Sequence, residues 1–297
     1  GEHLPYVDNM VNLLILSSRF DVSPSELMRV LAPGGVLLEL NDEGWRKTVK
    51  PVPNDIDEWT HYLHGPDNNA VANDTVVGPP RRLQWQAGPK WTRHHDKMST
   101  FSAMVSAGGR IFYIIDEGSM ASIMFPPHWA LIARDAFNGV TLWAHPIQAW
   151  QSSKTGFRSG PVQLPRRLVA VGDRVYATLG YGEPVVALDA ATGQKVWQQP
   201  VEVTGAVGGS YWCSLGAIYK DDTLVLFGVF LDGHYWKQFF DGQFESRRVV
   251  ALSGKDGGLL WQKNIGYRVR PVVIGDTFHA EPWAYDLRTG EQKTRVH

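Results

Sequence analysis

The densest group of residues that could do chemistry is the run Trp91-Thr92-Arg93-His94-His95-Asp96. Two adjacent histidines on an extended segment point to opposite sides, so both would not easily bind one metal ion. One of them, His94 or His95, could act as a general base or as a single ligand beside Asp96, with Arg93 binding an anion. The alternative is a hydrogen-bonded loop that leads into the first strand of a sheet.

A second group contains Trp59, His61 and His64, followed by Gly65-Pro66. Histidines at i and i+3 share one face of a helix, as some metal sites require. The glycine and proline that follow favour a turn instead. We therefore predict no metal site here and expect structural hydrogen bonds, while keeping the three residues as candidates for ligand binding.

A third group, His234-Tyr235-Trp236, lies in an aromatic stretch with Arg247-Arg248 nearby. Exposed aromatic rings can stack on a sugar or a planar cofactor, and a basic pair favours an acidic ligand. The same rings could equally cover an adjacent domain. Arg158, as a ligand for an anion or for backbone carbonyls, and His279, on or near a strand, complete the candidates.

These candidates are positioned by a repeat, A-x-D-x-x-x-G-x-x-x-W, that occurs in four segments without gaps. The segments start at Ala133, Ala187, Ala251 and Ala284. Their signature positions are Asp135, Gly139 and Trp143; Asp189, Gly193 and Trp197; Ser253, Gly257 and Trp261; and Asp286, Gly290 and Thr294. The third segment thus has serine for aspartate, and the fourth has threonine for tryptophan.

An alternating, β-branched stretch with a tight turn precedes each segment and predicts a hairpin. The hairpins are expected at residues 105–113, 169–176, 218–226 and 272–278. The aspartate can accept backbone N–H bonds in a turn, the glycine permits a positive φ, and the tryptophan can pack between neighbouring sheets. Radial stacking of such sheets predicts a mainly β fold, a β-propeller with four-stranded blades over residues 84–297, of which about four blades are visible.

The repeat, above all in Val185-to-Trp197, resembles the pyrroloquinoline-quinone (PQQ) type of repeat. Quinoprotein dehydrogenases share this repeat with non-enzymatic propellers such as the outer-membrane assembly scaffold. The resemblance implies PQQ with calcium as the cofactor of an enzymatic member, and the periplasm or cell envelope as the compartment. The enzymes hold the quinone between a tryptophan and a disulfide of adjacent cysteines, whereas Cys213 is the only cysteine here.

Residues 1–42 show a different pattern, which predicts a small β-α-β segment. Ser23-Pro24-Ser25-Glu26 is a capping box, and apolar strands are expected at 11–16 and 36–40. With the run Arg29-to-Gly35, this segment resembles the C-terminal half of class I S-adenosylmethionine-dependent methyltransferases. The glycine-rich cofactor loop of that family is not in the sequence, so we assign no cofactor-binding residue. Residues 43–83 are predicted to be a linker that leads into the propeller.

The overall composition narrows the partners. The formal net charge is -1 over 297 residues, which gives no reason to expect nucleic acid as a partner. No apolar run approaches the roughly 20 residues of a membrane-spanning helix. The sequence starts at Gly1 and ends inside a repeat, which suggests a piece of a longer protein; its partners would be the remainder of that chain or another protein.

Three functions fit these observations. The first is a non-catalytic propeller scaffold that binds a protein or a ligand, such as a carbohydrate or another small molecule. The second is a quinone (PQQ)-dependent dehydrogenase. The third is a polysaccharide lyase or hydrolase with a histidine, arginine and tyrosine site in the propeller funnel. The repeat specifies the fold and leaves the activity open.

Overall fold

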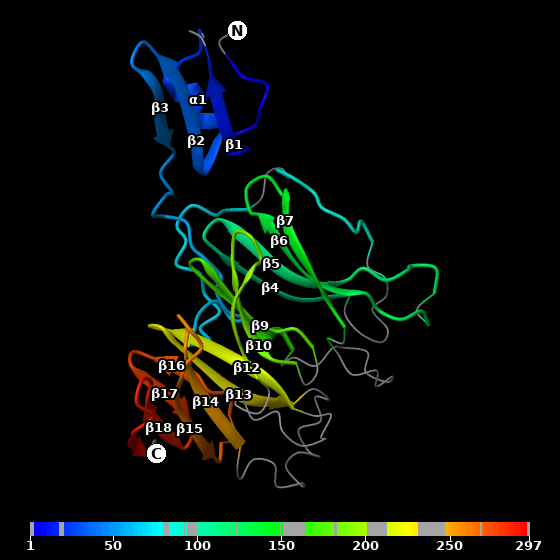
Figure 1. Ribbon diagram of the computed structural model, residues 1–297, viewed down its shortest axis with the longest axis vertical. Coiled ribbons are helices and arrows are strands. Elements are labelled where there is room, and N and C mark those ends of the chain that lie inside the picture. The colour runs from blue at the N-terminus through cyan, green and yellow to red at the C-terminus, as the bar shows by residue number, and fades with distance from the viewer. Residues whose placement is uncertain are drawn as a thin grey trace.

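The chain folds into a small N-terminal sheet and four larger four-stranded sheets that follow one another in an arc (Figure 1). The computed structural model describes residues 3–17, 21–79, 83–91, 93, 100–122, 124–148, 150, 164–180, 183–200, 213–230, 247–267 and 269–295. Among these residues, no helix has the length and apolar character needed to cross a bilayer. The fold is mainly β, as the repeat predicts.

Each of the four larger sheets is an antiparallel meander, the blade of a propeller. Blade 1 contains β4 (Phe101–Ala107), β5 (Arg110–Asp116), β6 (Trp129–Asp135) and β7 (Thr141–Ile147). Blade 2 contains β8 (Leu168–Val171), β9 (Arg174–Thr178), β10 (Val185–Asp189) and β11 (Lys195–Gln199), and the short 3-10 helix η1 (Leu164–Arg167) precedes it. Blade 3 contains β12 (Cys213–Lys220), β13 (Thr223–Phe230), β14 (Arg247–Ser253) and β15 (Leu259–Ile265). Blade 4 contains β16 (Val272–Ile274), β17 (Thr277–Ala280), β18 (Trp283–Asp286) and β19 (Gln292–Arg295).

The repeat forms the turn between the third and fourth strands of each blade, as expected. In blade 2 the Asp189 carboxylate accepts the backbone N–H groups of Ala191 and Thr192 at 3.1 and 2.8 Å. Gly193 then adopts a φ of +71°, which costs a residue without a Cβ little. In blade 3 the backbone N–H of Gly257 still donates to the Ser253 carbonyl, so the turn survives without the aspartate.

The repeat tryptophans pack between neighbouring blades, which confirms a second prediction. The Trp143 indole of blade 1 donates to the Ala190 carbonyl of blade 2 at 3.0 Å. A Cβ on Gly193 would lie 2.7 Å from this indole, so glycine is needed there for space as well as for φ. Trp197 and Trp261 make the same pair of contacts with the turns of blades 3 and 4.

Trp85 makes the same contact on blade 1 although it belongs to no repeat segment identified in the sequence. Its indole donates to the Ala136 carbonyl at 3.0 Å and lies against Gly139. Trp85 therefore occupies the place that a preceding blade's tryptophan would take. The signal available in the sequence was a tryptophan in a polar stretch just upstream of the first hairpin.

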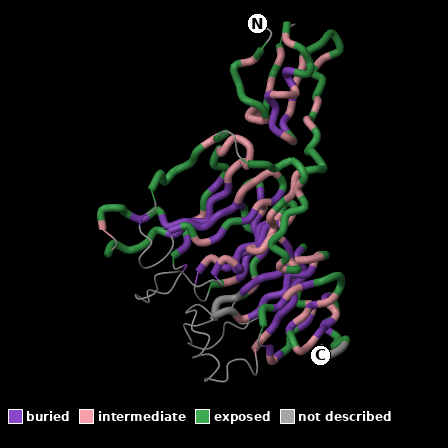
Figure 2. The backbone as a smooth tube through the Cα atoms, turned by 180° about the vertical axis from the view of Figure 1, so that it is seen from behind, coloured by how far each residue is buried: buried purple, intermediate pink, exposed green. Residues whose placement is uncertain are grey.

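The apolar core of the blades is divided into separate clusters, one between each pair of neighbouring sheets. One cluster joins blades 1 and 2, a second joins blades 2 and 3, and a third joins blades 3 and 4. The first strands β4, β8, β12 and β16 lie next to one another, so they form the inner side of the arc. Buried residues accordingly concentrate in the blades, whereas much of the segment before blade 1 is exposed (Figure 2).

The N-terminal sheet contains β1 (Val11–Leu16), α1 (Pro24–Val30), β2 (Leu31–Asn41) and β3 (Gly44–Val49). Strands β1 and β2 pair in parallel, which confirms the β-α-β segment, and β3 adds an antiparallel strand. The Ser23 hydroxyl accepts the Glu26 N–H at 3.2 Å, as the capping box predicts. The strand predicted at 36–40 begins earlier, at Leu31, because Gly34 with its φ of +78° and a bulge against β1 let the strand pass through Pro33-Gly34-Gly35.

Candidate functional site at the propeller axis

Residues 57–68, which we call the axial segment, cross the inner strands of all four blades. Each inner strand donates one backbone N–H to this segment, and in every blade the donor is the second residue before the turn. The donors are Ser106 to Trp59 O at 2.8 Å, Ala170 to Thr60 O at 3.0 Å, Tyr219 to His61 Nε2 at 3.0 Å and Val273 to Pro66 O at 2.9 Å. One connecting segment therefore holds the four blades together at the axis.

Sheet chemistry explains why such a segment is needed. The innermost strand of a blade is an edge strand. Its N–H groups that point away from its own sheet, towards the propeller axis, have no partner within that sheet. At the centre of the arc these groups would be buried and unpaired, which costs about 1–3 kcal/mol each. The axial segment supplies the acceptors.

His61 is a neutral hydrogen-bond acceptor inside this structure. Its Nε2 accepts the Tyr219 N–H, so the ring proton must lie on Nδ1, which is 2.7 Å from the Thr60 hydroxyl. That hydroxyl donates onward to the His64 carbonyl at 3.1 Å. Burial lowers the pKa of His61 from 6.5 to about 3, because a charged imidazole would lose its hydration. His61 is thus uncharged at neutral pH.

His64 and Trp59 are also engaged within the axial segment. His64 Nε2 lies 2.6 Å from Asp57 Oδ2, and the Trp59 indole donates to the Tyr62 carbonyl at 3.1 Å. The Asp57 carboxylate accepts the backbone N–H of Asn73, which with the Glu58 N–H and His64 lowers the pKa of Asp57. The three candidates of this group therefore come together in a tight turn that is held by internal hydrogen bonds.

Two adjacent arginines of η1 are buried, and one of them, Arg166, contacts the axial segment. Arg167 donates to the carbonyls of Trp150, Thr178 and Gly180 at 2.8–3.0 Å, and its guanidinium lies 4.1 Å from the Trp150 ring. Arg166 donates from Nη1 to Asn68 Oδ1 at 2.8 Å. Burial, together with the charge of Arg270, lowers the pKa of Arg166 from 12.5 to about 10. Sequence reasoning singled out neither arginine, and a basic pair ahead of a strand was the only signal.

Arg93 is a buried clamp on the insertion between β5 and β6. Its Nη1 binds the Asp116 carboxylate at 2.8 Å, and Nε donates to the Ser119 carbonyl at 2.9 Å. Nη2 donates to the carbonyls of Ser122 and Phe125. The anion that Arg93 binds in this structure is therefore an internal one.

The remaining candidates are separate from the axial segment or are not described. His279 lies on β17, opposite Ala284 of β18. The face of blade 4 that packs on blade 3 carries Phe278 and Tyr285, so His279 points to the other face. His94, His95, Asp96, Arg158, His234, Tyr235 and Trp236 lie outside the described residues.

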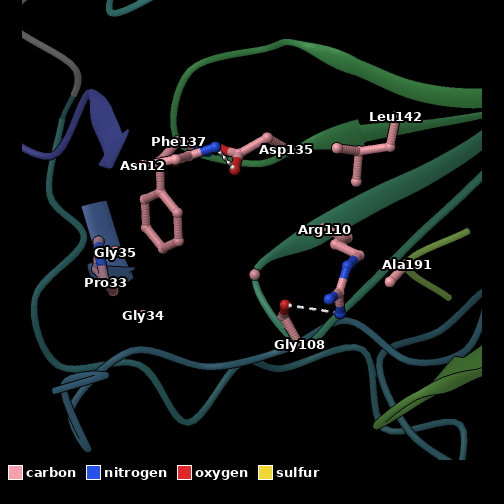
Figure 3. A pocket seen from close by; sticks show the side chains of 11 residues that line it. Asn12, Pro33, Gly34, Gly35, Gly108, Arg110, Asp135, Phe137, Leu142 and Ala191 are labelled. Carbon is pink, nitrogen blue, oxygen red and sulfur yellow. Dashed lines mark hydrogen bonds between the residues drawn. The ribbon is translucent and has the colours of Figure 1, made fainter. Parts of the chain in front are cut away.

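A second candidate site is a cavity of about 340 Å³ between the N-terminal sheet and the rim of blade 1. Its lining includes Asn12, the Pro33-to-Gly35 stretch, Arg110 and Asp135 (Figure 3). Asn12 Nδ2 donates to Asp135 Oδ2 at 3.0 Å, so the carboxylate that closes the blade turn also contacts the N-terminal sheet. Polar and apolar residues both line the cavity, and the sequence did not predict it.

Comparison with known proteins supports no family assignment. No protein-family model matches the chain, and no curated protein sequence matches it. Three similar solved structures are a europium-containing methanol dehydrogenase, BamB from Moraxella catarrhalis and the quinohemoprotein alcohol dehydrogenase from Comamonas testosteroni.

These similarities are remote. The identities are 14%, 16% and 12%, and the TM-scores are 0.42, 0.36 and 0.45. The matches cover 70%, 64% and 80% of this chain but only 32%, 48% and 40% of the other proteins. The chain thus spans less than half the length of each, and the assignment of its fold depends on its own blades and turns.

Proposed function

We propose that this protein is a non-catalytic propeller scaffold that binds a partner or a ligand. The observation that carries the proposal is the use of the axial polar groups. His61 is buried and neutral, His64 is paired with Asp57, and Trp59 donates to a carbonyl of its own turn. The His61 side chain joins blade 3 to the axial segment, and the other two side chains stabilise the turn of the segment itself, which supports a structural role for this group.

The fit of a quinone cofactor argues in the same direction. The arrangement known from the quinoprotein enzymes requires a disulfide between adjacent cysteines, and the sequence has Cys213 alone. Within the described residues, no group of three or more His, Cys, Asp or Glu side chains is placed to hold a metal ion. The described residues, together with the single cysteine of the sequence, therefore do not fit a PQQ and calcium site of that type, and we derive no reaction through one.

The N-terminal sheet offers the surface for a partner. Paired residues of β1, β2 and β3 put Leu13, Ile15, Leu40, Trp45 and Val49 on the face opposite α1, all of them exposed. A parallel sheet is normally covered on both faces. We propose that an amphipathic helix of a partner protein covers this face.

We keep the methyltransferase resemblance of this sheet as a proposal about origin rather than activity. The parallel pair with its crossover helix supports it. Because the glycine-rich cofactor loop is not in the sequence, we expect no heat of binding when S-adenosylmethionine is titrated into the protein. Saturable binding would contradict the proposal.

A turnover assay with a variant control tests the scaffold proposal. The protein would be assayed with PQQ, calcium and a redox dye on alcohols and sugars, and on uronate polymers for unsaturated products. We expect no turnover from the protein or from its His94→Ala/His95→Ala variant. Turnover by the protein that the double variant loses would overturn the proposal and favour one of the two enzymatic alternatives.

The partner surface can be tested separately. An Ile15→Cys variant should react quickly with a maleimide in this chain, and mass spectrometry distinguishes that site from Cys213. In a purified complex with that partner, the same cysteine should react much more slowly. Equal rates in every context would show that no helix covers the face.

A further inference from the structure

The Arg166 guanidinium is a buried cation with one free edge. The side chain is 4% exposed, and Nη1 donates to Asn68 Oδ1. Nε and Nη2 have no hydrogen-bond partner among the residues that the structure describes. Two charged N–H donors are thus buried and unpaired on the same side chain.

The two unpaired nitrogens define the shape of a ligand. The N–H bonds of Nε and Nη2 run parallel along one edge of the guanidinium plane, and this edge matches the two oxygens of a carboxylate. Asn68 does not compete for it, because Asn68 accepts from Nη1 and donates through Nδ2 to the Pro271 carbonyl at 3.1 Å. The free edge therefore has bidentate geometry.

The electrostatics of the site favour an anion. A buried charge is costly unless it is paired, and within the described part of the chain Arg166 forms no ion pair with a carboxylate. Its contact with the Tyr62 ring, at 5.5 Å, offsets only part of that cost. Arg270 adds a second positive charge nearby, which lowers the pKa of Arg166 and would attract an anion.

The neighbouring arginine shows what a purely structural arginine looks like here. Arg167 comes from the same turn of η1 and is equally buried, but its guanidinium is held by three backbone carbonyls and the Trp150 ring. The same turn thus places both Nη1 and Nη2 of Arg167 on backbone carbonyls, whereas Nε and Nη2 of Arg166 have no hydrogen-bond partner among the described residues.

We propose that Arg166 is an anion-binding site at the propeller axis and that its ligand is the carboxylate of a small molecule. A carboxylate needs only one bidentate arginine, and a single guanidinium balances its single charge. The carboxylate could belong to a simple organic acid or to a sugar acid, and the experiment separates these sources. The proposal holds whether or not the propeller is a scaffold.

Thermal unfolding and calorimetry with defined anions test the site. Sodium acetate and sodium glucuronate would be compared with glucose and with sodium chloride at equal ionic strength. We expect glucuronate, acetate or both to raise the melting temperature of the protein and to bind saturably, while glucose does neither. A larger effect of glucuronate would indicate a sugar acid, and equal effects would indicate the carboxylate alone.

Three variants make the result specific. Arg166→Met should lose the carboxylate effect, and Arg166→Lys, which keeps the charge without the bidentate edge, should bind at least about tenfold more weakly. Arg46→Met, which removes an exposed arginine of β3, should respond as the unmodified protein does. An equal response of Arg166→Met, or the same shift with chloride, would overturn the proposal.

Discussion

Between neighbouring blades one contact is repeated with the same residue types, whereas along the axis each blade meets a different residue of a single segment. Trp85, Trp143, Trp197 and Trp261 each place an indole on a glycine turn and donate to the carbonyl three residues before that glycine. The axial segment meets the same N–H of each blade with a different acceptor, three carbonyls and one imidazole. The repeated contact forms the interfaces between blades. The residues at the axis come from one segment that is not repeated, so each of them occurs once in the chain.

This contrast indicates which residues of a repeat protein are available for ligand binding or catalysis. A residue that occurs once per blade is committed to the interface between blades. Residues that occur once per chain, such as His61 and Arg166, are not bound by that requirement. The predictions below test the two regions against each other, beginning with the largest expected effect.

Removing a tryptophan between two blades should lower the free energy of unfolding more than any other change. Trp143→Ala deletes a buried indole and leaves a cavity between blades 1 and 2, which we expect to lower the free energy of unfolding by about 3–5 kcal/mol. Urea unfolding followed by circular dichroism would measure it. Trp45→Ala, at a position 55% exposed, is the matched control and should change little. Equal effects would mean that the blades do not depend on this contact.

Removing the imidazole that accepts the Tyr219 N–H should lower the free energy of unfolding less. His61→Leu leaves the Tyr219 N–H buried without a partner, and we expect a loss of about 1–3 kcal/mol. His61→Gln restores an acceptor and should recover part of the loss. If the His61→Leu variant is as stable as the unmodified protein in urea unfolding, the imidazole is not needed to join blade 3 to the axial segment.

The contribution of the axial segment to the free energy of unfolding should also depend on pH, unlike that of the tryptophan contacts. His61 has a folded pKa of about 3 and an ordinary value of 6.5, so between these values the unfolded chain binds more protons. Stability from this group is therefore complete above pH 6.5 and falls as the pH drops toward 3, by up to about 1.4 kcal/mol per pH unit.

The variant His61→Gln isolates this contribution. The difference in unfolding free energy between the protein and the variant should shrink or reverse as the pH falls from 7 to 4 in urea titrations, because other groups titrate alike in both. The pKa of Asp57 is also lowered, so the stabilisation from that carboxylate is lost only as the pH falls below its ordinary pKa of 3.8. A difference that is flat from pH 7 to 4 would show that His61 titrates normally.

The smallest effect is expected at the contact between the N-terminal sheet and blade 1. Asn12→Ala removes exposed hydrogen bonds to Asp135 and Asn138, which are worth at most about 1 kcal/mol. The thermal unfolding of the blades should not change. A loss as large as that of Trp143→Ala would mean that the blades depend on the N-terminal sheet.

Much of the fold could be predicted because its signals are local. The aspartate, the glycine and the four-residue spacing to the tryptophan are required by one turn, so four copies predicted four blades and their hairpins. The capping box at Ser23 worked for the same reason, since it involves residues three apart. Trp85 was missed because its partner turn lies more than fifty residues away, at Gly139.

The sequence by itself determined the blades, the β-α-β segment and the shortage of cysteine for a quinone site of the known type. The tertiary structure was needed to assign the protonation state and the partners of individual residues outside the repeat. It made His61 a neutral acceptor for a strand 158 residues away, gave Arg93 an internal carboxylate, and placed Arg167 on three backbone carbonyls while leaving two nitrogens of Arg166 without a partner among the described residues. The physical reason is that burial and partners set the charge and the free donors of a side chain, and both come from segments distant in the chain.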